Sequence, residues 1–164
     1  MSKPLGHGFK ICFFVVADHA GESLTCRSRT GFIVMLNNAP IYWHSKNQTS
    51  VETSTFGSAI RAMKQAADYI QGLCYKLRMV GIPVEKPSYM YGNNQSVLAV
   101  STRPESTLKK KAQIIVFNFI CEGCAADEWR TTYINKSENI SYLMIKPLSG
   151  EKRWQLIRKL LCHI

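Results

Sequence analysis

Residues 56–77 read FGSAIRAMKQAADYIQGLCYKL and carry an apolar side chain at every third or fourth position. Apolar residues at this spacing lie along one face of an α-helix, and that face packs against the rest of the protein. The apolar positions are Phe56, Ile60, Met63, Ala67, Ile70, Cys74 and Leu77. The spacing predicts an amphipathic helix of about six turns. Thr53 or Ser54 is a suitable N-cap, and Gly81 with Pro83 ends the helix.

The residues before this helix predict three antiparallel strands. A buried-strand run at residues 10–16 is followed by a polar turn. Two further β-rich runs, at residues 31–36 and 40–45, are joined by Asn37-Asn38. Strand runs separated by such turn residues are typical of an antiparallel meander.

The residues after the helix alternate between strand and helix patterns. We expect strands at 88–91 and 129–134, helices at 95–100, 108–124 and 151–161, and a short helix opened by residues 137–139. The order β-β-β-α-β-α-α-β-α-α predicts an α/β fold, in which helices pack on a mixed sheet. No internal repeat or linker is evident, so we expect a single domain over residues 10–164 after an N-terminal extension at residues 1–9.

The composition is that of a folded protein, with 46% hydrophobic and 20% charged residues among 164. A disordered tail would contain fewer apolar residues. The sequence contains no run of 18 apolar residues, which is about the length needed to span a bilayer, so we expect no membrane partner. The six cysteines lie mostly in apolar patterns, which indicates free thiols in a reducing intracellular compartment such as the cytoplasm, the nucleus or an organelle. Cys121 and Cys124 form a lone CxxC and the four histidines are scattered, so we expect no metal or other cofactor.

The charge balance is strongly basic. The chain has 21 Lys and Arg residues against 11 Asp and Glu residues, a formal net charge of +10. A domain with this excess of positive charge most often binds a polyanion, nucleic acid above all. The alternative is a solvated basic surface with no such partner.

Short motifs follow one another in a characteristic order from about residue 10 to residue 161. They are Val16-Ala17-Asp18-His19-Ala20-Gly21, Arg29-Thr30-Gly31, Ala39-Pro40-Ile41-Tyr42-Trp43, Ser45-Lys46-Asn47-Gln48, Val51-Glu52-Thr53-Ser54-Thr55-Phe56-Gly57-Ser58, Tyr75-Lys76-Leu77-Arg78-Met79, Asn94-Gln95-Ser96, Pro104-Glu105-Ser106-Thr107-Leu108-Lys109-Lys110-Lys111 and Lys146-Pro147-Leu148. In these motifs and their spacing the chain resembles the ribonuclease H domain at the end of copia-type retrotransposon polyproteins. The resemblance implies a ribonuclease H-like fold. The expected fold is a mixed five-stranded sheet in which three antiparallel strands are followed by strands added in parallel, with helices flanking the sheet.

The resemblance also implies a catalytic site, and here the sequence departs from the family. Its enzymes hydrolyse the RNA strand of an RNA–DNA hybrid with two divalent metal ions held by four carboxylates. Mg²⁺ takes hard oxygen ligands, and two such ions close together need negative charge around them. The four corresponding positions hold no acid, being Val16, Ala59, Asn93 and Tyr142. We therefore expect no ribonuclease H activity and no bound metal.

Other acids are poor substitutes for the missing four. Asp18 is expected in the turn after the first strand, Glu52 precedes the long helix, and Glu138 lies four residues before Tyr142. One or two displaced carboxylates do not make a site for two metal ions.

The leading functional hypothesis is a catalytically inactive, basic module that binds RNA or an RNA–DNA hybrid. Such a duplex is recognised mainly through its backbone and shape, which requires cationic and polar contacts. The candidate contacts are Arg27, Arg29, Lys46, Gln48, Asn94, Gln95, Ser96, Lys109, Lys110 and Lys111. Two alternatives stay open. One is a domesticated structural subunit of a larger ribonucleoprotein or protein assembly, contacted through apolar residues of the last helix. The other is an RNA–DNA hybrid endonuclease with a rearranged site.

Overall fold

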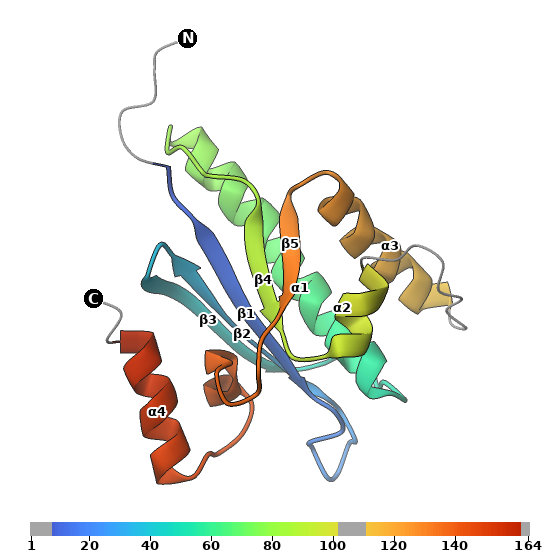
Figure 1. Cartoon of the computed structure of the whole chain (residues 1–164). Coiled ribbons are helices and arrows are strands. Elements are labelled where there is room, and N and C mark those ends of the chain that lie inside the picture. The colour runs from blue at the N-terminus through green and yellow to red at the C-terminus, as the bar shows by residue number, and fades with distance from the viewer. Residues whose placement is uncertain (1–7, 102–110, 162–164) are drawn as a thin grey trace.

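A five-stranded mixed sheet forms the centre of the protein, in a computed structural model that describes residues 8–101 and 111–161. The strands lie in the order β3-β2-β1-β4-β5 (Figure 1). β1 (Ile11–Asp18), β2 (Arg29–Leu36) and β3 (Ala39–Asn47) pair antiparallel, whereas β4 (Ser88–Gly92) and β5 (Trp129–Tyr133) add in parallel. The predicted fold class and sheet are therefore confirmed.

β1 is the central strand and is buried on both faces, which explains its continuous apolar run. Ile11, Phe13 and Val15 point into the larger core, and Val16 belongs to a second core on the other face. β1 also runs further than the sequence indicated, because Asp18 pairs with Arg29 as the last residue of the ladder. The expectation that the chain is already turning at Asp18 was wrong.

Three helices pack on the first face of the sheet. They are α1 (Thr55–Met79), α2 (Gln95–Ser101) and α3 (Lys111–Ala125). Of the two predicted caps of α1, Ser54 is the one used, since its hydroxyl accepts a hydrogen bond from the Gly57 amide at 3.0 Å. The predicted start of the third helix at Leu108 lies outside the described residues.

The second face of the sheet is covered by η1 (Ile140–Met144), a 3₁₀ helix, and α4 (Gly150–Leu161). Asn139 sets the position of η1. Its side-chain Nδ2 donates a hydrogen bond to the Val15 carbonyl at 3.0 Å, and its Oδ1 accepts one from the backbone amide of Ser141. Gly31 in β2 permits close packing, because a Cβ there would lie 2.6 Å from Ile145 Cγ2. The short helix expected from residues 137–139 thus begins at Ile140, capped by Asn139.

The cysteines, the lengths of the helices and the exposed residues of α4 relate to the expectations about cofactors and partners. The five cysteines in the described ranges are free thiols, as expected, and Cys162 lies outside those ranges. Burial raises the pKa of Cys121 and that of Cys124. Within residues 8–101 and 111–161, no helix is long and apolar enough to cross a membrane. On α4, Leu156 is buried, whereas Trp154 and Leu161 are exposed.

Candidate functional site

A cavity of about 550 Å³ opens where β1 and β4 end. Its walls come from β1 and the turn after it, the first turns of α1, the loop from β4 into α2, the end of β5, and η1. The lining residues are Ala17, Asp18, His19, Thr55, Ser58, Ala59, Asn93, Asn94, Gln95, Tyr133, Lys136, Tyr142, Ile145 and Lys146.

Three of the four positions singled out in the sequence line this cavity, and the fourth lies beside it. Ala59, Asn93 and Tyr142 line it, and Val16 lines a smaller adjoining hollow that it shares with Ala59 and Asn93. They come from β1, α1, the end of β4 and η1, so the fold brings residues 126 positions apart in the chain to one place. Val16 is only 2% exposed and packs in the second core with Tyr142 and Ile145.

The polar groups among these four positions satisfy each other. The Asn93 side-chain amide donates a hydrogen bond to the Tyr142 hydroxyl. The pKa of Tyr142 is raised, first by burial and then by electrostatic repulsion from Asp18 and from Tyr133. The hydrogen bond from Asn93 lowers the pKa and so opposes this increase. The Lys146 ammonium lies 5.2 Å from the centre of the Tyr142 ring.

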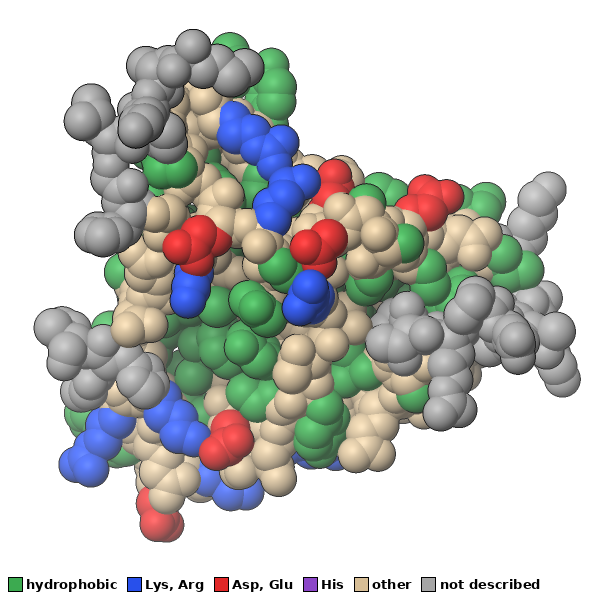
Figure 2. Space-filling view, turned by 45° about the horizontal axis from the view of Figure 1, so that its top comes forward, with side chains coloured by type: hydrophobic (Ala, Val, Ile, Leu, Met, Phe, Trp, Pro, Cys, Tyr) green, Lys and Arg blue, Asp and Glu red, His purple; other side chains and the backbone are tan. Residues whose placement is uncertain are grey.

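Positive charge predominates among the cavity's ionisable groups. Among the described residues that line it, Asp18 is the one carboxylate, against the ammonium groups of Lys136 and Lys146. Figure 2 shows a face on which Lys and Arg side chains are interspersed with acidic and hydrophobic ones.

Comparison with known proteins supports the family that the motifs indicate. The retrovirus-related Pol polyproteins from transposons RE1 and RE2 of Arabidopsis thaliana are 27% and 26% identical to this chain over 133 residues. Each match covers 81% of this chain but 9% of the polyprotein, so the chain spans a small part of these relatives. No protein-family model matches the chain.

Solved structures share the fold. LC11-RNase H1, solved in complex with an RNA/DNA hybrid, superposes with a TM-score of 0.63 at 14% identity, over 83% of this chain and 94% of that one. The foamy viral protease-reverse transcriptase, solved in complex with dsDNA, gives 0.56 at 8% identity, over 88% and 93%. This chain is a homologue of retrotransposon Pol polyproteins and has the ribonuclease H fold. The predicted resemblance to the copia-type ribonuclease H domain is confirmed.

The donor groups of this ribonuclease H-like domain do not suit two divalent ions. Val16 and Ala59 offer no ligand atom, and the Asn93 amide is engaged by Tyr142. No group of three or more His, Cys, Asp or Glu side chains within the described residues could hold a metal ion.

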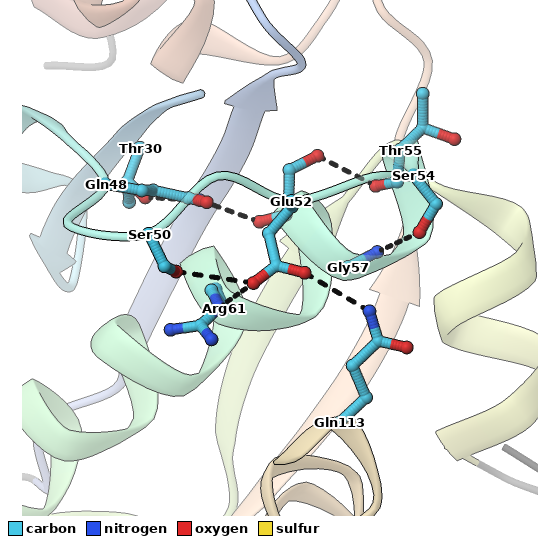
Figure 3. Close-up of polar contacts among 10 residues, drawn as sticks. Thr30, Gln48, Ser50, Glu52, Ser54, Thr55, Gly57, Arg61 and Gln113 are labelled. Atoms are coloured by element: carbon cyan, nitrogen blue, oxygen red, sulfur yellow. Dashed lines mark hydrogen bonds and ion pairs between the residues drawn. The ribbon is translucent and has the colours of Figure 1, made fainter. Parts of the chain in front are cut away.

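The other two acids considered as substitutes are engaged away from the cavity. Glu52 is buried, pairs with the Arg61 guanidinium and accepts a hydrogen bond from the Gln113 side chain at 3.2 Å (Figure 3). Glu138 lies 3.7 Å from the Lys159 ammonium. Asp18 alone faces the cavity.

The predicted nucleic-acid contacts separate into different groups. Asn94 and Gln95 line the cavity, although Asn94 Oδ1 also accepts from the Val97 amide at 3.2 Å as α2 begins. The side chains exposed elsewhere are Arg27, Arg29, Lys46 and Ser96. Lys109 and Lys110, and the side chain of Lys111, lie outside the described residues.

Gln48 was wrongly predicted as a phosphate contact. It is 2% exposed, and its Nε2 donates to Thr30 Oγ1 at 3.0 Å and to the Ser58 carbonyl at 2.9 Å. A side chain held in this way ties the end of β3 to α1 and cannot reach a ligand.

Sequence reasoning missed several cavity residues of this ribonuclease H fold. Lys146 belongs to a quoted motif but was not assigned a role, and Lys136 and Tyr133 had no local signal. His19 also lies in a motif, and its Nδ1 is buried with no hydrogen-bond partner among the described residues.

Proposed function

We propose that this ribonuclease H-like domain binds nucleic acid, either RNA or an RNA–DNA hybrid, without cleaving it. One observation carries the proposal. The four positions at which the resemblance implies catalytic acids hold Val16, Ala59, Asn93 and Tyr142; the last three line one cavity, and Val16 lines the hollow that adjoins it.

The chemistry of these side chains argues against hydrolysis with two metal ions. At a separation of about 4 Å and an effective dielectric constant of about 20, two divalent cations repel each other by roughly 17 kcal/mol. Asp18 supplies one negative charge, and Lys136 and Lys146 add two positive ones. In this mechanism the metal ions activate the attacking water and stabilise the leaving oxygen. The described residues of the cavity offer no set of side chains that could hold those ions.

The same cavity suits a phosphate backbone. Its lysines provide the point charges, and the side chains of Gln95 and Asn94 can hydrogen-bond sugar or phosphate oxygens. Losing the family's acids also removes the repulsion between a carboxylate cluster and an incoming phosphate. Two proteins of the same fold were solved with an RNA/DNA hybrid and with dsDNA, which supports this class of ligand.

A labelled RNA–DNA hybrid tests both parts of the proposal. We expect binding in EDTA at low salt, with an affinity that falls steeply as salt rises because phosphate contacts release counterions. We expect no cleavage with Mg²⁺ or Mn²⁺. Absence of binding at low salt would refute the binding function, and metal-dependent cleavage by the purified chain would refute inactivity.

A further inference from the structure

The cavity continues into two further hollows on the second face of the sheet. A hollow of about 330 Å³, between the end of β5, η1 and α4, shares Lys136, Tyr142 and Lys146 with the first cavity. A third, of about 320 Å³, shares Lys146 and Leu148 with the second. We call the first two hollows together the η1–α4 groove, whose basic residues are Lys136, Lys146 and Lys152.

The three lysines of the η1–α4 groove are exposed and unneutralised. Within the described ranges, none of them takes part in an ion pair. Ion pairs elsewhere in the described ranges include Lys10–Glu85, Lys64–Asp68, Arg130–Asp127 and Lys159–Glu138.

Acids are nearly absent from the walls of the three hollows. Among the residues that the structure describes, Asp18 lines the first hollow, and no carboxylate lines the second or the third. Glu151 on the first turn of α4 lines none of them. Arg29 and Arg153 add positive charge at the third hollow. Charges of one sign that line a cleft raise the local concentration of ligands of the opposite sign, so the arrangement favours an extended anionic ligand.

We propose that the phosphate backbone of one nucleic-acid strand follows the η1–α4 groove and is held directly by Lys136, Lys146 and Lys152, without a divalent metal. This inference rests on the proposed function and specifies the path of the strand. Tyr133, 47% exposed at the rim of the cavity, offers a ring on which a base can stack.

The test compares two variants that each remove three positive charges. The groove variant is Lys136→Gln/Lys146→Gln/Lys152→Gln. The control variant is Lys76→Gln/Arg78→Gln/Lys86→Gln, whose exposed positions at and after the end of α1 line none of the three hollows. Hybrid binding is measured in EDTA at several salt concentrations, and circular dichroism checks that each variant is folded.

For the groove variant we expect about a 30-fold loss of affinity at low salt and a salt dependence lower by about two to three in log–log slope. The control variant should lose less than about 3-fold by its smaller net charge alone. If the groove variant does not fold, the single variant Lys152→Gln should lower the slope by about one.

The outcomes separate the two proposals. If the wild-type chain binds no hybrid at low salt, the proposed function itself fails. If it binds but both triple variants lose affinity equally, or the single Lys152→Gln variant leaves the slope unchanged, only the groove is wrong. Binding that disappears in EDTA would overturn direct recognition by the lysines.

Discussion

Restoring the family's acids should turn the cavity into a metal site. The variant is Val16→Asp/Ala59→Glu/Asn93→Asp/Tyr142→Asp. Ala59, Asn93 and Tyr142 line the cavity, and Val16 lines the adjoining hollow that also borders Ala59 and Asn93, so the new carboxylates would lie in and directly beside one space. Carboxylate oxygens are the ligands that Mg²⁺ prefers.

The magnitude follows from the burial of the replaced side chains. Val16 is 2% exposed and Tyr142 is 9% exposed, so removing each apolar side chain costs about 1.5–3 kcal/mol. Burying a carboxylate at position 16 adds to that cost. Without metal the variant should therefore lose about 5 kcal/mol, a large part of the stability of a domain. If the restored site binds Mg²⁺ with a Kd of about 0.1 mM, 10 mM Mg²⁺ returns about 2.7 kcal/mol.

Urea unfolding followed by circular dichroism, with and without 10 mM Mg²⁺, measures this difference. The matched control is Val16→Asn/Ala59→Gln/Tyr142→Asn, which keeps Asn93 and places four amides at the same positions. We expect Mg²⁺ to raise the unfolding midpoint of the carboxylate variant alone. Calorimetry should show a binding heat for that variant and none for the control.

The reasoning is refuted if a folded carboxylate variant shows neither stabilisation nor heat with Mg²⁺ or Mn²⁺. If the quadruple variant is unfolded even with metal, the double variant Ala59→Glu/Asn93→Asp takes its place. Both of its positions lie on the open cavity wall, so this variant should fold and show a smaller Mg²⁺-dependent rise. No rise in the double variant would also refute the reasoning.

Three further predictions concern stability. Glu52→Ala should lower the free energy of unfolding by about 3 kcal/mol in urea titrations, because it leaves a partly buried Arg61 guanidinium unpaired; a loss below about 1 kcal/mol would contradict a structural role for the pair. Gly123→Ala should cost about 1–3 kcal/mol, since its Cβ would lie 1.9 Å from the Trp129 ring, whereas Gly72→Ala, in open space on α1, should be neutral or stabilising in the same titration. Burial, together with the charge of Lys46, lowers the pKa of His44, so the unfolded chain takes up a proton at His44 more readily. The free energy of unfolding should accordingly fall as the pH drops below about 6.5. It should fall less for His44→Phe, a variant that keeps a ring stacked on Phe32. An equal pH dependence of the unfolding free energy in the two chains would count against this.

The sheet and the long helix were predictable because their hydrophobic periods are strong. Ile60 and Ile70 of the apolar stripe are both buried, and the first three runs of β-forming residues became the antiparallel strands. Local capping chemistry was also informative, as Ser54 shows. Positions at the ends of elements were less predictable, because pairing with another strand decides them. Asp18 remained in β1 because Arg29 lies opposite it.

Side-chain burial in loops depends on distant partners and could not be predicted from local sequence. Gln48 follows the exposed Lys46 in a polar stretch, which suggested another exposed side chain. The Ser58 carbonyl in α1 and the hydroxyl of Thr30 in β2 make it a buried link instead. The η1–α4 groove could not be predicted from local sequence either, because η1 is placed on the sheet by a hydrogen bond between Asn139 and Val15, which lie 124 positions apart.

The charge of the cavity connects the basic composition with the four positions at which the resemblance implies acids. With Asp18 against Lys136 and Lys146, the lining residues carry a formal charge of +1. Adding the family's four carboxylates at and beside the cavity would make it −3, while the whole chain would change only from +10 to +6. A cavity at −3 repels phosphate until metal ions fill it, whereas a cavity at +1 attracts phosphate directly. Under our proposal Mg²⁺ is therefore a competitor for the phosphates and weakens binding at constant ionic strength. In the variant with acids at positions 16, 59, 93 and 142 the same ion should strengthen binding, and that reversal of sign follows from these four side chains alone.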